Sequence, residues 1–239
     1  MKLNLFKLKI IAFISLTFFT LSISGLISNS ILNYSFMFLG FVCVPLFAFI
    51  IIEGYKHTRS INKYLLRILL LAILTAFPHR YVILAIDSAF DAQSFYSSAF
   101  TGLFCLMCIV IYDKIANKYA KIFCIIFTVV VSFVIGYEFA PHAIIITYIL
   151  FICRDKKFFE KAYYLVSYAL VITVVSFFML KGAKVDNNIE LYQNICLSGS
   201  ILAVPLLKKY DGTKGPSCKI FSYSYYLILL GIIVGVKML

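Results

Sequence analysis

Glu53, His57 and Arg67 are the ionisable residues whose types and spacing are most suited to chemistry. Glu53 ends an apolar run and His57 follows four residues later, so the two side chains share a face if the helix continues. Arg67 lies one turn into the next apolar run, and the short connection places it within reach of Glu53. Such a group can bind an anionic ligand or move a proton. Spacing alone favours the simpler interpretation, a salt-bridged turn that only fixes two helices.

A second candidate group consists of His79 and Arg80, which follow Pro78, together with Glu138 and His142, which are four residues apart. Histidine is well suited to proton transfer near neutral pH. Both sites are predicted near the outer lipid–water boundary, where histidine and arginine also occur as plain anchors. We interpret them as anchoring residues.

The seven cysteines indicate neither a disulfide framework nor a metal site. Their number is odd, and most lie inside apolar runs. Cys105 and Cys108 form a C-x-x-C pattern without a second ligand pair, so we interpret them as small core residues. The sequence also contains no P-loop, no GxSxG motif and no HExxH motif. We therefore predict no metal cofactor.

The composition is that of an integral membrane protein. Hydrophobic residues make up 63% of the 239 residues and charged residues 13%, whereas a soluble chain is about half apolar and a quarter charged. The formal net charge is +12, but the basic residues lie between apolar runs and not on one face of an element, which argues against a nucleic-acid partner. Membrane lipid is the expected partner, and residues 1–239 are predicted to form a single membrane domain.

Hydropathy predicts an all-α fold, a polytopic transmembrane helical bundle of about nine helices. Three of the runs are short for a span, and Pro78 is expected to kink one of them. The predicted spans are Leu8–Ile27, Tyr34–Ile52, Tyr64–Pro78, Phe95–Tyr112, Ile122–Gly136, Pro141–Cys153, Ala162–Leu180, Ile189–Leu207 and Ile220–Val236.

The basic residues predict the orientation of these spans. With nine spans and the N-terminus in the cytoplasm, 18 of the 22 basic residues fall on the cytoplasmic side, as the positive-inside rule requires. One miscounted span would exchange the sides of everything after it. We therefore predict a cytoplasmic N-terminus and an outside C-terminus. The four basic residues on the outer side are Arg80, Lys181, Lys184 and Lys237.

The segment Val44–Arg67 reads VPLFAFIIIEGYKHTRSINKYLLR and resembles the TraX family of membrane proteins, named for a conjugative pilin acetylase. The stretch Pro205–Gly215, PLLKKYDGTKG, resembles a second family pattern, and Lys9–Ala12 and Gly102 match further positions. The residues of the first segment that match the family pattern are Pro45, Leu46, Phe47, Phe49, Glu53, Gly54, His57, Thr58, Tyr64 and Arg67.

The resemblance implies a multi-pass protein of the bacterial inner membrane that transfers an acetyl or acyl group from cytoplasmic acetyl-CoA to pilin or another envelope acceptor, such as a glycan. It implies His57 as the base, with Glu53 beside it. Basic residues of the same segment are then expected to hold the CoA phosphates electrostatically. These cofactor-binding candidates are Arg59, Lys63 and Arg67.

The sequence departs from the family pattern at three positions. Phe19 and Thr20 stand where the family usually has an Asp-His pair, and Tyr226 stands where the last helix usually has a histidine. Tyr226 can donate a hydrogen bond and is the third catalytic candidate, but a phenol, with a reference pKa of about 10, is a poor base. The alternative is therefore a catalytically impaired relative that acts as a membrane assembly or interaction protein. A small transporter is less favoured, since no inverted repeat is evident.

Overall fold

The computed structural model describes residues 2–84, 97–135, 139, 141–153, 163–164, 168, 195–216 and 219–238. Within these residues the chain forms helices joined by short turns, and its only β-type pairing is one isolated parallel bridge between Leu3 and Tyr210. Its contacts divide into two compact units, Met1–Leu46 with Lys157–Ser217 and Phe47–Lys156 with Cys218–Leu239. The fold is therefore all-helical in its described part, and the single membrane domain remains a prediction.

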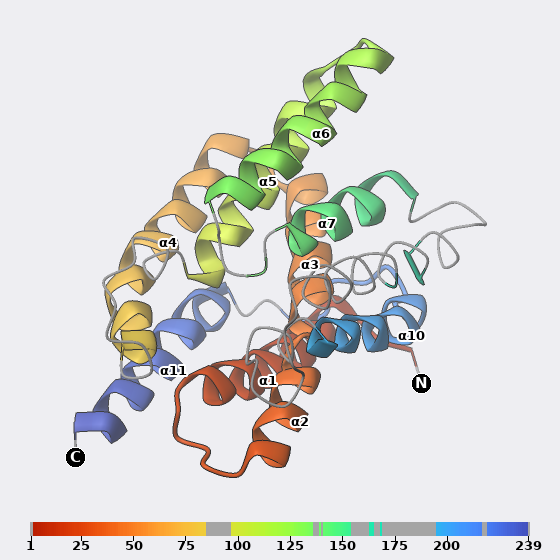
Figure 1. Cartoon of the computed structure of the whole chain (residues 1–239). Coiled ribbons are helices and arrows are strands. Elements are labelled where there is room, and N and C mark those ends of the chain that lie inside the picture. The colour runs from red at the N-terminus through yellow and green to blue at the C-terminus, as the bar shows by residue number, and fades with distance from the viewer. Residues whose placement is uncertain are drawn as a thin grey trace, which may run out of the picture. The chain divides into compact units, whose positions relative to one another are not determined.

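The first unit contains α1 (Leu5–Ile23), α2 (Ser30–Gly40), η3 (Leu197–Leu202) and α10 (Ala203–Lys208), which are labelled in Figure 1 except for η3. An asparagine caps each of the first two helices by accepting a backbone N–H bond, as is common at helix N-termini. A Cβ atom on Gly40 would lie 2.7 Å from the backbone of Phe19. A glycine is therefore needed where α1 and α2 meet.

A loop from Lys209 to Gly215 holds the N-terminal end of α1, and we call it the clamp loop. The Leu3 amide donates to the Lys209 carbonyl oxygen at 2.8 Å, and the Asp211 amide donates to the Leu3 carbonyl oxygen at 2.9 Å. The Leu5 amide donates to the carbonyl oxygen of Thr213 at 2.9 Å. Backbone groups near the helix start that have no partner inside the helix are thus paired.

The second unit contains most of α3 (Cys43–His57), together with α4 (Ile61–Leu84), α5 (Ser98–Lys114), α6 (Lys118–Ile135), α7 (His142–Cys153) and α11 (Lys219–Met238). Figure 1 shows α4 and α11 beside each other, and the two helices are in contact. The core of the unit consists of aliphatic side chains from α3, α5, α7 and α11. Those with no solvent exposure include Ile52, Leu106, Ile109, Ile144, Ile146 and Leu230.

A helix occurs at each predicted span except Ala162–Leu180, most of which lies outside the described residues. The structure differs from the predicted spans in two details. The second span is divided, because α2 ends at Gly40 and α3 begins at Cys43. Pro78 lies inside α4 and does not end it, although proline removes the backbone donor that would pair with the carbonyl of Leu74.

Four helical segments in the described part of the chain are long and apolar enough to cross a membrane: Leu5–Ile23, Ser30–His57, Ile61–Val82 and Phe221–Met238. The exposed faces of several helices are also apolar. On α4 the exposed side chains repeat at helical spacing, as expected for a surface that faces lipid. They include Leu66, Leu70, Leu74, Phe77 and Tyr81.

The described cysteines are free thiols, and all but Cys153 are buried. Cys105 and Cys108 lie in the core of α5 with 2% and 1% of their surface exposed. Their burial agrees with the interpretation of the C-x-x-C pattern as small core residues.

Candidate functional site

The turn between α3 and α4 places the residues of the candidate site, and it is held by hydrogen bonds within a few residues. The Thr58 hydroxyl donates to the Ser60 carbonyl oxygen at 3.2 Å, and that oxygen also accepts from the Tyr64 amide at 3.2 Å. The Ser60 hydroxyl accepts from the Lys63 amide at 3.5 Å at the start of α4. We call Glu53–Arg67 the α3–α4 hairpin.

Gly54 allows the two helices of the hairpin to meet closely. A Cβ atom at this position would lie 2.5 Å from the hydroxyl oxygen of Tyr64 and 2.8 Å from its Cζ atom. Real Cβ atoms do not approach other atoms so closely. Tyr64 therefore packs directly on the backbone of α3, next to Glu53.

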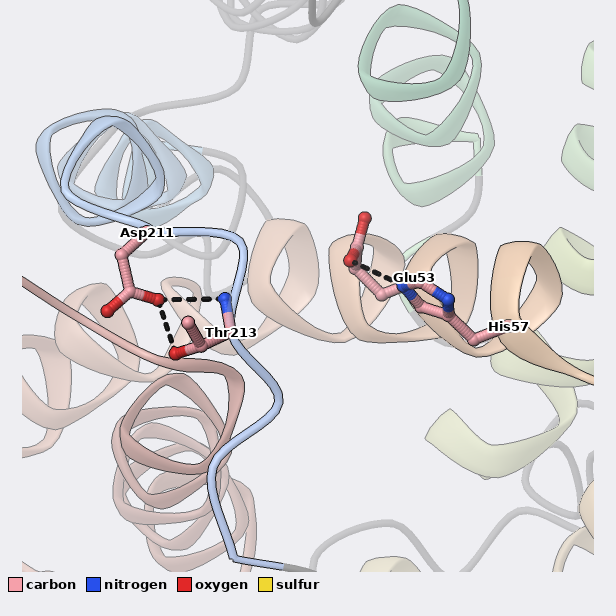
Figure 2. Close-up of polar contacts among 4 residues, drawn as sticks. All are labelled: Glu53, His57, Asp211 and Thr213. Carbon is pink, nitrogen blue, oxygen red and sulfur yellow. Dashed lines mark hydrogen bonds and ion pairs between the residues drawn. The ribbon is translucent and has the colours of Figure 1, made fainter.

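Glu53 and His57 lie on the same face of α3 and contact each other, as a shared face predicts. The Nε2 atom of His57 lies 3.7 Å from Oε2 of Glu53, as Figure 2 shows. The side chain of Glu53 is 6% exposed, whereas that of His57 is 46% exposed. The buried carboxylate is thus next to an imidazole that water reaches. When His57 is protonated the contact is a charge pair, and when it is neutral the ring can accept a proton.

Arg67 does not join this pair. Within the residues that the structure describes, no ion pair connects Arg67 to Glu53, and the Arg67 side chain is exposed. The hairpin instead carries a group of exposed basic side chains around the Glu53–His57 pair. These are Lys56, Arg59, Lys63 and Arg67.

Tyr55 ties the end of α3 to the end of α5. Its hydroxyl donates to a carboxylate oxygen of Asp113 at 2.6 Å. The bond lies two residues before His57, so it fixes the end of the helix that carries the pair.

Tyr226 is in contact with His79, which sequence reasoning had assigned to the membrane boundary. Its hydroxyl oxygen is 3.1 Å from Nδ1 of His79. His79 is 1% exposed, so it is a buried residue and the interpretation as an anchor was wrong. No local pattern of the sequence indicates this contact, because the two residues are 147 positions apart and lie on different helices. Glu138, the predicted neighbour of His142, lies outside the described residues.

Phe19 and Thr20 are packing residues of the first unit. Phe19 is 6% exposed and its ring lies 5.4 Å from that of Phe41. The Thr20 hydroxyl donates to the carbonyl oxygen of Leu16 at 2.8 Å, within its own helix. The described residues contain no group of three His, Cys, Asp or Glu side chains able to hold a metal ion.

Together, the helices of membrane-spanning length and the hairpin with its Glu–His pair describe an all-helical protein compatible with a membrane. The family model of the TraX protein matches residues 4–237, which is nearly the whole chain. The chain belongs to the TraX family. Comparisons with curated proteins and with solved structures found no match.

The structure divides the family-like residues into two kinds. Gly54, Thr58 and Tyr64 build the turn, and Gly215 lies in the clamp loop at φ +65°, where a Cβ atom would meet the side chain of Asn4. These residues have a structural reason to be present. Glu53 and His57 are different, since the hydrogen bonds given above for the turn do not involve their side chains.

Proposed function

We propose that this protein transfers an acetyl or acyl group from cytoplasmic acyl-CoA to an acceptor in the cell envelope. Membership of the TraX family and the Glu53–His57 pair support the proposal. The pair is the observation that carries it, because an imidazole held against a buried carboxylate is a common arrangement of a general base. His57 is the proposed base of the hairpin, and Glu53 orients it.

The proposed binding site for the CoA phosphates is the group of exposed cations on the α3–α4 hairpin. Arg59, Lys63 and Arg67 lie within nine residues of each other and are exposed. Guanidinium and ammonium groups bind phosphate through charge-assisted hydrogen bonds. Acetyl-CoA is the proposed co-substrate, and no metal ion enters the proposal.

The protein is proposed to be a multi-pass protein of the bacterial inner membrane with nine spans, a cytoplasmic N-terminus and an outside C-terminus. Two contacts in the second unit agree with this order of spans. Tyr55 and Asp113 join the ends of two helices that are both predicted to finish in the cytoplasm. On α4 and α11, His79 pairs with Tyr226 and Val82 with Lys237, so the helices run in the same direction.

Binding of acetyl-CoA to the purified protein tests the proposal most directly. We expect measurable binding by calorimetry, weakened about tenfold by each of Arg59→Gln and Lys63→Gln, as expected when a charged hydrogen bond is lost. Lys118→Gln is a matched control, because it removes an exposed cation from the start of another helix. Binding that is absent, or equally affected by all three variants, would contradict the proposed site.

Pilin, an envelope glycan and other envelope molecules are the proposed acceptors. The mass of mature F-type pilin, produced with and without this protein in a host that lacks its own pilin acetylase, tests the first of them. Because the family's Asp-His positions hold Phe19 and Thr20, we expect pilin to gain little or none of the added mass, ~42 Da per acetyl group. Full acetylation that survives His57→Ala would remove the role proposed for His57.

A second candidate function is that of a non-catalytic relative acting in membrane assembly. The packing of Phe19 and Thr20 supports it, because both positions serve the contact of α1 with its neighbours and its own backbone. A protein of this kind would not bind acetyl-CoA. The calorimetric experiment therefore separates the two candidates.

A further inference from the structure

Two buried side chains on different helices of the second unit form a hydrogen bond that the hairpin site does not use. The Tyr226 hydroxyl on α11 lies 3.1 Å from Nδ1 of His79 on α4. His79 is 1% exposed and Tyr226 is 6% exposed. The two residues are 147 positions apart in the sequence, so only the packing of α4 against α11 brings them together.

Two more buried hydroxyl groups lie one turn away, that of Thr75 on α4 and that of Ser97, the residue before α5. Thr75 precedes His79 by four residues and so shares its helix face, and its Oγ1 atom lies 2.9 Å from the hydroxyl oxygen of Ser97. Both residues have no exposed surface. We call Thr75, His79, Ser97 and Tyr226 the buried polar cluster.

A polar cluster between membrane helices has two ordinary explanations. Hydrogen bonds between hydroxyl groups of different segments stabilise their packing, and the contact of Thr75 with Ser97 is explained in this way. A histidine is a costly choice for packing, because both ring nitrogens need partners in an apolar interior. An imidazole bonded to a phenol is instead suited to moving a proton, and ionisable residues inside spans mark functional sites by default.

We propose that Tyr226 and His79 form a proton relay that activates the nucleophile of the acyl acceptor, an amine or a hydroxyl group. The relay rests on the acyl-transfer function proposed above, and it takes the place of His57 as the base that acts on the acceptor. It gives Tyr226, the catalytic candidate from the sequence, a partner that sequence reasoning did not assign.

For an amine acceptor, the nitrogen attacks the thioester carbonyl and loses a proton to Oη of Tyr226, while the Tyr226 hydroxyl proton moves to Nδ1 of His79. The C–N bond forms and the C–S bond breaks, and the CoA thiolate leaves with that electron pair. His79 then returns its proton through Tyr226 to the thiolate, so the products are an amide and the CoA thiol.

The two groups need each other for this chemistry. A neutral phenol is too weak a base to take the proton of the acceptor by itself, and an imidazole is the stronger base of the two. Passing the phenol proton to the imidazole lets the phenolic oxygen accept one from the acceptor without a free phenolate. Tyr226 therefore contacts the acceptor, and His79 acts through Tyr226.

The relay is compatible with phosphates bound at the hairpin. Arg67 and His79 are twelve residues apart on α4, which is about 18 Å along the helix axis. An extended pantetheine arm spans about 14 Å, by analogy with an extended peptide of equal bond number, and the diphosphate adds to this length. The length of the arm with its diphosphate thus matches the distance along α4 between Arg67 and the relay.

Single-turnover acetylation in vesicles tests the relay. The protein is reconstituted in phosphatidylcholine with acetyl-CoA and a synthetic apolar peptide that has a free amino terminus, and the peptide mass is followed. We expect Tyr226→Phe and His79→Asn each to slow transfer by about 10²–10⁴-fold without changing acetyl-CoA affinity. The double variant should be no slower than the slower single variant. Tyr225→Phe, which removes the hydroxyl group of the adjacent tyrosine, should keep the wild-type rate.

The outcomes separate the relay from the proposed function. Wild-type rates in Tyr226→Phe or His79→Asn overturn the relay and leave acyl transfer standing. Absence of transfer in the wild type overturns the relay, and absence of acetyl-CoA binding in the same sample overturns the acyl-transfer function with it.

Nitrogen NMR tests the hydrogen bond without any turnover, because the chain has only three histidines to assign. We expect Nδ1 of neutral His79 to be an unprotonated acceptor whose chemical shift changes in Tyr226→Phe but not in Tyr225→Phe. A proton on Nδ1 of neutral His79 would reverse the direction of the bond and overturn the relay.

Discussion

At the scale of single residues, the Glu53–His57 pair is open to water on one side only. The carboxylate is buried at 6% exposure, and the imidazole is 46% exposed. A positive charge on the imidazole would therefore lie next to a carboxylate that is largely shielded from water. The strength of the contact depends on the charge of the imidazole.

A double-mutant cycle on Glu53→Gln and His57→Gln measures this contact. We expect a coupling of about 0.5 kcal/mol in the free energy of unfolding, as for other i,i+4 pairs of which one member is exposed. The matched cycle on Glu53→Gln and Arg67→Gln should be additive. Coupling in the second cycle and none in the first would show that the pair is wrongly assigned.

The close contact of Gly54 with Tyr64 leads to a second prediction. Gly54→Val places carbon atoms where the Tyr64 hydroxyl and ring already lie, and we expect it to lower stability by about 1–3 kcal/mol, as for other overpacked sites. Thermal unfolding in detergent measures the loss. Gly231→Val is the control, because a Cβ atom there meets nothing within 4 Å. Tyr64→Phe, which removes the nearest atom, should recover part of the loss.

At the scale of elements, the clamp loop contains two glycines that differ in the atoms that a new Cβ atom would meet. Gly212 and Gly215 both have positive φ, +81° and +65°, so alanine is strained at each by about 1 kcal/mol. Only at Gly215 would the new Cβ atom also meet a side chain, Asn4 at 2.8 Å. We therefore expect Gly215→Ala to lower the melting temperature more than Gly212→Ala. Equal losses would mean that Asn4 moves away freely.

The clamp loop also has a measurable pH dependence. Figure 2 shows Asp211 accepting bonds from the Thr213 hydroxyl at 2.6 Å and the Thr213 amide at 2.9 Å. These bonds, with the nearby charge of Lys2, hold the pKa of Asp211 below its usual value. Since the folded pKa is the lower one, the loop gains stability above the ordinary pKa of about 3.9 and loses it as the pH falls through the folded pKa.

Carboxyl carbon NMR checks this prediction. The titration midpoint of Asp211 should lie below that of an unfolded peptide, and Thr213→Val, which keeps the amide but removes the hydroxyl group, should raise it. An unchanged midpoint in Thr213→Val would show that the hydroxyl bond does not contribute.

Local spacing predicted what lies within one helix, and it failed for contacts between helices. The Glu53–His57 contact was predicted because helix geometry alone sets the i,i+4 distance. The pairing of Arg67 with Glu53 was not found, since a long flexible side chain at a helix surface is directed by its surroundings. His79 and Tyr226 meet only through the packing of α4 against α11, which no local pattern encodes. Likewise, Phe41 and Val42 interrupt the second span although its apolar run is continuous.

At the scale of the whole molecule, the distribution of basic residues makes the topology testable. A reporter that is active only outside the inner membrane should be active when fused after Leu239 and silent when inserted between Asp211 and Gly215. Both expectations follow from placing 18 of the 22 basic residues in the cytoplasm. The opposite pattern would refute nine spans with a cytoplasmic N-terminus.

The clamp loop also sets an order of events during synthesis. The amides of Leu3 and Leu5 pair with the carbonyl groups of Lys209 and Thr213, which are made much later. At roughly 5–20 residues per second, about 10–40 s of translation separate the two partners. The N-terminal end of α1 therefore lacks these backbone partners until synthesis has passed Thr213. The first unit is thus completed late, by the clamp loop, whose partners at the start of α1 are made long before it.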